Sequence, residues 1–110
     1  MRIFKYFLLN IILTIPIISN AMEALTIEIS IENHKFEPEE IKAPKDTKLK
    51  LVIHNKDTTI EEFESLDLNR EKIIPPGKKI HLILPPLKSG RYNFYGEFHT
   101  ETAKGVLVVE

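Results

Sequence analysis

The chain has 110 residues, of which 15 are basic and 16 acidic, and its formal net charge at pH 7 is −1. This length accommodates one domain, and the absence of a basic stripe argues against nucleic acid as a partner. The chain contains no cysteine, so disulfides, thiolate metal ligands and a lipidated cysteine anchor are all excluded. The core must therefore hold together by packing alone.

Residues 1–21, MRIFKYFLLNIILTIPIISNA, have the layout of a cleaved signal peptide. Arg2 and Lys5 begin the segment, an apolar run follows, and small residues occupy the −3 and −1 positions of a cleavage site after Ala21. A membrane anchor is the alternative, but the run is shorter than the ~20 residues that a spanning helix needs. We therefore expect residues 22–110 to form a periplasmic domain, with a net charge near −3 because two of the basic residues are lost.

Apolar and polar residues alternate along most of this domain, which is the pattern of half-buried β-strands. The alternation is clearest over residues 25–31, 49–53 and 80–84. The C-terminal segment VLVV, residues 106–109, is apolar on both faces, as expected of a central strand.

Turn signals rich in proline and glycine separate these segments, and they lie at residues 43–46, 75–77 and 85–90. No window of 12 residues carries a helical stripe, although residues 65–70 have room for one short helical turn. Several short strands at this spacing predict an all-β fold, a Greek-key β-sandwich or barrel.

The side chains suited to chemistry gather in two segments, DTTIEEFE at residues 57–64 and GEFHTE at residues 96–101. None of the serines lies in a G-x-S-x-G context and no glycine loop suits a phosphate, so we expect a binding protein rather than an enzyme. Each segment follows a predicted strand, and in a sandwich two such loops can meet at one end.

The spacing within these segments suggests a metal site. Glu62 and Glu64 lie two residues apart, as do Glu97 and His99, so each pair would face one side of an extended chain. Three carboxylates and an imidazole suit a hard or borderline ion. Glu61 is the reserve candidate, because it shares the side of Phe63 unless the chain bends there. The alternative is that these acidic residues are simply solvated.

The remaining histidines carry weaker signals. His34 is expected at the surface near a strand end, and His81 is out of phase with its apolar neighbours and should face solvent. His54 ends an apolar strand, where a structural hydrogen bond is at least as plausible as metal ligation. None of the three is included in the predicted site.

The order of motifs resembles a cupredoxin. FEPEEI at residues 36–41 and LKLVIHNKD at residues 49–57 are similar to its first half. Pro76-Gly77, SGRYNF at residues 89–94 and the final Lys104-Gly105 before an apolar strand are similar to its second half. The resemblance covers nearly all of residues 25–110 and implies a cupredoxin-like sandwich.

The resemblance implies that most of the metal ligands of a blue-copper cupredoxin are replaced by other residues in this chain. Gly96 stands at the cysteine position, His99 at the histidine position, and Thr102 or Ala103 at the methionine position. Glu61 or Glu62 stands where the first histidine ligand is expected. Because a type 1 blue-copper centre requires a thiolate, we predict that none forms here.

Within the superfamily, the chain is most similar to EfeO-type cupredoxin-like proteins, through the glutamate-x-glutamate pair of EEFES and the segment FYGEFHTETAKG. That resemblance implies binding of Cu(II) or Fe(III) in the periplasm and a role in iron or copper acquisition. The implied partner is an inner-membrane metal permease or a periplasmic metal-uptake protein. A metal-free interaction module is the first alternative, and an electron-transfer protein is the second.

Overall fold

The structure, a computed structural model, describes residues 23–110. It contains nine strands and one turn of 3₁₀ helix: β1 (Leu25–Glu32), β2 (Lys35–Glu37), β3 (Glu40–Ala43), β4 (Leu49–Asn55), β5 (Glu61–Ser65), β6 (Arg70–Ile74), β7 (Lys79–Leu84), β8 (Gly90–Gly96), η1 (Glu97–His99) and β9 (Lys104–Val109). The predicted signal peptide, residues 1–21, lies outside the described residues. No helix in the described part is long and apolar enough to cross a membrane.

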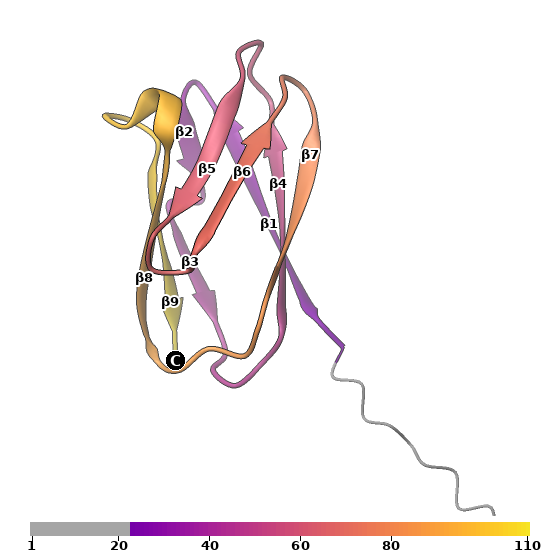
Figure 1. Cartoon of the computed structure of the whole chain (residues 1–110), viewed down its shortest axis with the longest axis vertical. Helices are drawn as coiled ribbons and strands as arrows, with labels where there is room; N and C mark the ends of the chain where they lie inside the picture. Colours follow the sequence, from indigo (N-terminus) through magenta and orange to yellow (C-terminus); the bar gives the residue numbers. More distant parts are fainter. Residues whose placement is uncertain (1–22) are drawn as a thin grey trace, which may run out of the picture.

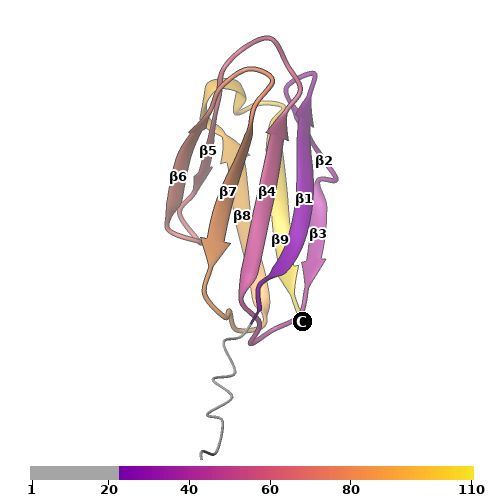
Figure 2. The same ribbon diagram turned by 90° about the vertical axis from the view of Figure 1, so that its right-hand side faces the viewer.

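The strands form two sheets that pack face to face (Figures 1 and 2). One sheet has the order β2-β1-β4-β7 and the other the order β3-β9-β8-β5-β6. The chain passes from one sheet to the other between β2 and β3, β3 and β4, β4 and β5, β6 and β7, and β7 and β8. The predicted all-β sandwich is therefore confirmed.

The alternation read from the sequence corresponds to the inner faces of the two sheets. Ile29, Ile31, Leu49, Leu51 and Ile53 are buried on the first sheet. On the second sheet β9 lies between β3 and β8, as expected of a central strand. Burial of these side chains between the sheets is the main favourable contribution to folding.

Three phenylalanines meet where the sheets face each other. The ring of Phe94 lies edge-on to Phe36 at a centroid distance of 4.9 Å and stacks on Phe63 at 5.2 Å. Both geometries are favoured arrangements of aromatic pairs. Because Phe63 belongs to β5 and Phe94 to β8, this cluster fixes the strands that lead into the candidate site.

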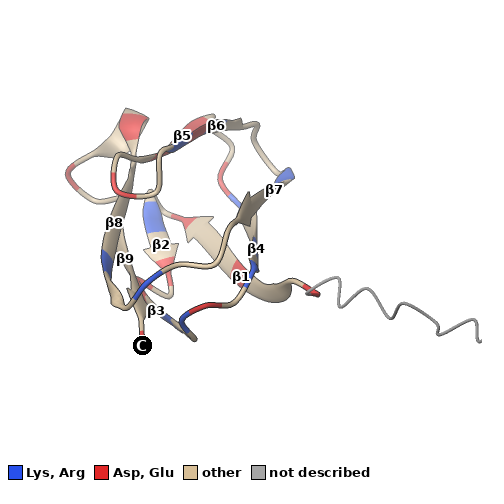
Figure 3. Cartoon of the chain, turned by 60° about the horizontal axis from the view of Figure 1, so that its bottom comes forward, with Lys and Arg blue, Asp and Glu red and all other residues tan. Residues whose placement is uncertain are grey.

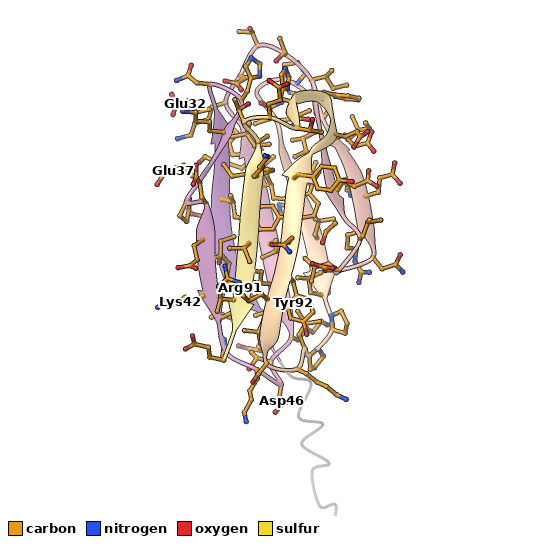
Figure 4. The ribbon with its side chains drawn as sticks, turned by 90° about the vertical axis from the view of Figure 1, so that its left-hand side faces the viewer. Glu32, Glu37, Lys42, Asp46, Arg91 and Tyr92 are labelled. Atoms are coloured by element: carbon orange, nitrogen blue, oxygen red, sulfur yellow. The ribbon has the colours of Figure 1, made fainter. Side chains whose placement is uncertain are left out.

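The outer face of the second sheet carries charged side chains from β3 and β8. Arg91 lies on this face, where its Nη1 is 3.7 Å from Oε1 of Glu40 (Figure 4). The neighbouring Tyr92 donates its hydroxyl to the carbonyl oxygen of Lys88 at 2.8 Å. These contacts hold the start of β8 in place, at the end of the sandwich away from η1 (Figure 1).

Four connections gather at the other end of the sandwich, which we call the loop end (Figure 1). It consists of the β1–β2 turn (residues 33–34), the β4–β5 loop (56–60), the β6–β7 turn (75–78) and the segment from η1 to β9 (97–103). The two segments that were expected to meet, EEFE and GEFH, do meet here, because Glu61 contacts both Phe98 and His99.

A candidate metal site at the loop end

Glu61 is the centre of the loop end. It is the first residue of β5 and faces the interior with Phe63, and its side chain is only 2% exposed. Its Oε1 accepts hydrogen bonds from the backbone N–H groups of Glu62 and Phe98, both at 2.9 Å. Its Oε2 lies 2.6 Å from Nδ1 of His99. A buried carboxylate is thus paired and hydrogen-bonded, as a buried charge must be.

Gly96 makes room for this carboxylate. A Cβ added to Gly96 would lie 2.6 Å from Cδ of Glu61, 2.8 Å from its Oε2 and 2.8 Å from Cβ of Ala103. Real Cβ atoms do not approach other atoms so closely, and Ala103 is fully buried. The volume of a side chain at position 96 is therefore occupied by the side chain of Glu61.

The segment from Gly96 to Ala103 is closed by its own backbone hydrogen bonds. The N–H of Gly96 donates to the carbonyl of Ala103 at 2.9 Å, and the N–H of Ala103 donates to the carbonyl of His99 at 2.8 Å. These two bonds hold residues 96–103 in a short closed loop, and His99 in this loop contacts Glu61. The His99 side chain remains 27% exposed, so one edge of the pair is open to solvent.

A second histidine packs against the His99 ring and leaves this edge open. The ring of His34, from the β1–β2 turn, stacks on the ring of His99 with centroids 3.6 Å apart and an angle of 27° between the planes. Nδ1 of His34 lies 3.7 Å from Oδ2 of Asp57. The same Asp57 carboxylate accepts the backbone N–H groups of Asn33 at 2.8 Å and His34 at 2.9 Å.

A separate acidic cluster lies on the outer face of the same sheet. Glu62 and Glu64 of β5 and Glu71 of β6 place one carboxylate oxygen each within 4.8 Å of the others. Figure 3 shows acidic residues on β5 and around η1. A hydrogen bond with Glu71, followed by partial desolvation and the nearby charges, raises the pKa of Glu62 to about 7. The cluster therefore shares a proton more readily than isolated carboxylates would.

The chain is similar to a family of known proteins. The family profile described as "Cupredoxin-like domain" matches residues 5–109. The chain belongs to the cupredoxin-like domain family. Over 85 residues this cupredoxin-like protein is also 53% identical to an uncharacterized protein of Rickettsia prowazekii (strain Madrid E), and the match covers 77% of this chain and 68% of that protein.

Solved structures with a similar fold include several copper proteins. Auracyanin A, a blue copper protein of Chloroflexus aurantiacus, has a TM-score of 0.69 at 13% identity, covering 80% of this chain and all of that one. A second similar structure is the metal binding domain of the Cu(I) exporting P-type ATPase CopA of Streptococcus pneumoniae D39, solved with Cu(I). Its TM-score is 0.67 at 18% identity, and the match covers 77% of this chain and 84% of that one. At these identities the likeness is one of fold.

The structure of this cupredoxin-like domain divides the predicted ligands into two groups. Glu62 and Glu64 face outward with Glu71, whereas His99 contacts the reserve candidate Glu61. Among residues 23–110, the acidic cluster is the one set of three or more potential ligands within 4.8 Å, and neither Glu97 nor His99 is part of it. The expectation that Glu62, Glu64, Glu97 and His99 converge on one point is thus not met.

Two local features explain this division. Alternation along β5 sends Glu61 and Phe63 inward, so Glu62 and Glu64 must point outward, away from the imidazole. Glu97 and His99 lie in η1, and residues two apart in a 3₁₀ helix point in different directions because the helix has 3.0 residues per turn. Glu97 is exposed, and its charge acts instead on Tyr95, whose pKa is raised chiefly by desolvation.

Three positions that the cupredoxin resemblance matched to blue-copper ligands, with Glu61 or Glu62 open for the first of them, do come together in this domain. Glu61, Gly96 and His99 form one contact group, with the carboxylate beside the imidazole and above the glycine. The donor set offers a carboxylate and an imidazole but no thiolate, and there is no space for a cysteine side chain at position 96 while Glu61 stays in place. These residues do not fit a type 1 copper centre, but their donors suit Cu(II) or Fe(III).

Proposed function

We propose that this cupredoxin-like protein is a periplasmic, non-enzymatic metal-binding protein that takes Cu(II) or Fe(III) at the loop end and serves iron or copper acquisition. The observation that carries the proposal is the 2.6 Å contact between Glu61 Oε2 and His99 Nδ1, which orients an imidazole at an edge open to solvent.

The chemistry of this pair supports the proposal. Histidines that bind metals usually donate one ring N–H to a carboxylate, which fixes the tautomer and leaves the other nitrogen to bind. Because Oε1 of Glu61 accepts two backbone N–H groups, the carboxylate is held as an acceptor for the His99 N–H. His99 is therefore the first residue expected to hold the ion, with Glu61 as its orienting partner. Soft ligands are scarce here, so Cu(I) should bind poorly.

The remaining support comes from similarity. The sequence likeness to EfeO-type proteins favours a role in metal uptake and a metal permease or periplasmic uptake protein as partner. The metal binding domain of CopA, which has a similar fold, was solved with Cu(I), so this fold can carry a copper site. The predicted signal peptide, outside the described residues, would bring the domain to the periplasm where such partners act.

A metal-free interaction module is the second candidate, and one observation favours it. The Glu61 carboxylate already has three protein hydrogen bonds, so it is satisfied without an ion. Ile60 precedes Glu61 in the sequence, and Phe98 donates its backbone N–H to the Glu61 carboxylate. Their side chains are 46% and 47% exposed and would be available to a protein partner. Electron transfer ranks third, because a thiolate-bound copper is excluded by composition.

Calorimetric titration of the purified protein with Cu(II), Fe(III) and Zn(II) would test the proposal. We expect His99→Ala to remove specific binding and Glu61→Gln to weaken it at least tenfold, as loss of an orienting partner does elsewhere. The matched controls are His81→Ala, on the outer face of the other sheet, and the double variant Glu62→Gln/Glu64→Gln. If His99→Ala binds as tightly as the parent, the metal site is wrong and the interaction module becomes the better function.

A further inference from the structure

We infer that His34 is a second imidazole ligand of this metal site, so that His34 and His99 bind one ion through their Nε2 atoms. Asp57 and Glu61 would be the carboxylates that orient the two rings. This inference rests on the proposed function and deepens it by adding a ligand from a different part of the chain.

The first support is the parallel arrangement of the two histidines. Each directs Nδ1 toward a carboxylate, His99 toward Glu61 at 2.6 Å and His34 toward Asp57 at 3.7 Å. In both rings this leaves Nε2 as the nitrogen that no described contact engages. The rings are in contact at 3.6 Å, although β1–β2 and η1 are far apart in sequence. Histidines that bind metals commonly direct one ring nitrogen toward a carboxylate. His99 has this carboxylate as a hydrogen bond, and His34 has one nearby.

The second support is the backbone at the β1–β2 turn. Asn33 and His34 both have positive φ, 53° and 59°. A two-residue turn of this kind favours asparagine followed by glycine, because only glycine adopts positive φ without steric cost. Here histidine stands at the glycine position. A strained residue that is kept in place by its surroundings points to a use for its side chain.

The third support is that this strained turn is anchored. Asp57 accepts the N–H groups of both Asn33 and His34, and the N–H of Asp57 donates to Oδ1 of Asn55 at 3.0 Å. Asn55 is fully buried at the end of β4. The position of His34 is therefore set by a chain of hydrogen bonds that begins in the core.

The stack itself must open for both rings to hold one ion. Rings only 27° from parallel direct their nitrogen lone pairs side by side rather than toward a common point. His34 is the ring that can turn, since its side chain is 39% exposed and its contact to Asp57 is longer than a hydrogen bond. His99 is held by the shorter bond to Glu61. We therefore expect binding to separate the rings by moving His34.

The test uses the variant His34→Gly, because glycine suits the turn and should leave the fold as stable as the parent or more so. Cu(II) and Zn(II) titrations of the purified protein are expected to show at least a tenfold loss of affinity. Electron paramagnetic resonance of the Cu(II) form should show coupling to two imidazole nitrogens in the parent and to one in His34→Gly. His81→Ala serves as the control.

The outcomes separate this inference from the proposed function. If His99→Ala abolishes binding while His34→Gly binds as tightly as the parent and keeps the same nitrogen coupling, His34 is not a ligand and the proposed function stands. If neither variant changes binding, the proposed function itself fails. A loss of affinity in His34→Gly with unchanged thermal stability supports the two-histidine site.

Discussion

The carboxylate of Glu61 occupies the position that a side chain on residue 96 would take. A Cβ on Gly96 would come within 2.6 Å of Glu61 Cδ, closer than real atoms approach. The resemblance to blue-copper cupredoxins predicts that this position corresponds to their cysteine ligand. The two arrangements are therefore mutually exclusive in this loop, and the glycine and the glutamate depend on one another.

Replacing Gly96 with alanine should lower the free energy of unfolding by about 2 kcal/mol, the usual cost of overpacking a buried site. Urea denaturation would measure this loss. In Gly96→Ala/Glu61→Ala the two effects should be less than additive by about 1 kcal/mol, because one clash is removed. Gly90→Ala is the control, since its nearest contact would be an ordinary 3.6 Å. Equal losses at positions 90 and 96 would contradict the steric argument.

Glu61→Gln and Glu62→Gln make a matched pair on adjacent residues of β5. Glu61→Gln should cost about 2 kcal/mol of stability, because hydrogen bonds to an ionised buried group are replaced by weaker ones. Glu62→Gln should be neutral or stabilising, because it removes one acid from the cluster with Glu64 and Glu71. Urea midpoints of the two variants provide the measurement. A greater loss in Glu62→Gln would show that the buried pair is not the stronger interaction.

The acidic cluster predicts a pH dependence of stability. The pKa of Glu62 is raised from 4.5 to about 7, chiefly by its hydrogen bond with Glu71. The folded state thus binds a proton more tightly than the unfolded state, so this group's contribution to stability falls as pH rises from 4.5 to 7.

Urea midpoints measured from pH 4.5 to 7 would test this dependence. The midpoint of the parent should fall across the window relative to that of Glu71→Gln, in which the main cause of the shift is removed. The difference should shrink in high salt, because exposed charges are screened. Parallel curves for parent and variant would show that Glu62 titrates independently of Glu71.

Export predicts a defined mature N-terminus. The basic start, short apolar run and small residues before position 22 predict cleavage after Ala21. Intact-mass measurement of protein from the periplasmic fraction should give a chain that begins at Met22. Recovery of a chain that still begins at Met1 in the membrane fraction would favour the anchor alternative.

Most of the fold could be predicted from the sequence, because the alternation of apolar and polar residues along a strand follows the burial of its two faces. Alternation over residues 25–31, 49–53 and 80–84 corresponds to β1, β4 and β7, and the predicted central strand is β9. The same parity placed Glu61 on the side of Phe63, as observed. Burial of a carboxylate costs free energy unless the group finds a partner, however. The partner here, His99, comes from a loop, and hydrophobic periodicity does not predict loop conformations.

The candidate site was harder to predict because turns have no period. Glu97 and His99 were expected on one side of an extended segment, but this segment forms a 3₁₀ turn. His34 was expected at the surface, and its stacking on His99 depends on a tertiary contact between the β1–β2 turn and η1. The available signal was local: in the sequence Asn33-His34, histidine occupies the place where a tight hairpin turn favours glycine.

Asn55 is the buried residue that anchors the loop end. Its Nδ2 donates to the carbonyls of Thr59 at 2.9 Å and Ile74 at 3.0 Å, and its Oδ1 accepts the N–H of Asp57. Asn55→Ala should cost about 3 kcal/mol, because three hydrogen bonds of a fully buried amide are lost and the buried carbonyl of Ile74 loses this donor. It should also weaken Cu(II) binding, because Asp57 no longer holds the turn that carries His34.

Asn55→Asp would separate the roles of the two ends of this side chain. The carboxylate can still accept from Asp57 but would face two carbonyl oxygens, so we expect a larger loss of stability than in Asn55→Ala. Asn93→Asp, where the side chain is exposed on β8, is the control and should change stability little. The measurements are urea denaturation and Cu(II) titration of each variant. If Asn55→Ala loses stability but keeps the parent's Cu(II) affinity, the position of His34 does not depend on this network, and the anchoring argument for the second ligand is wrong.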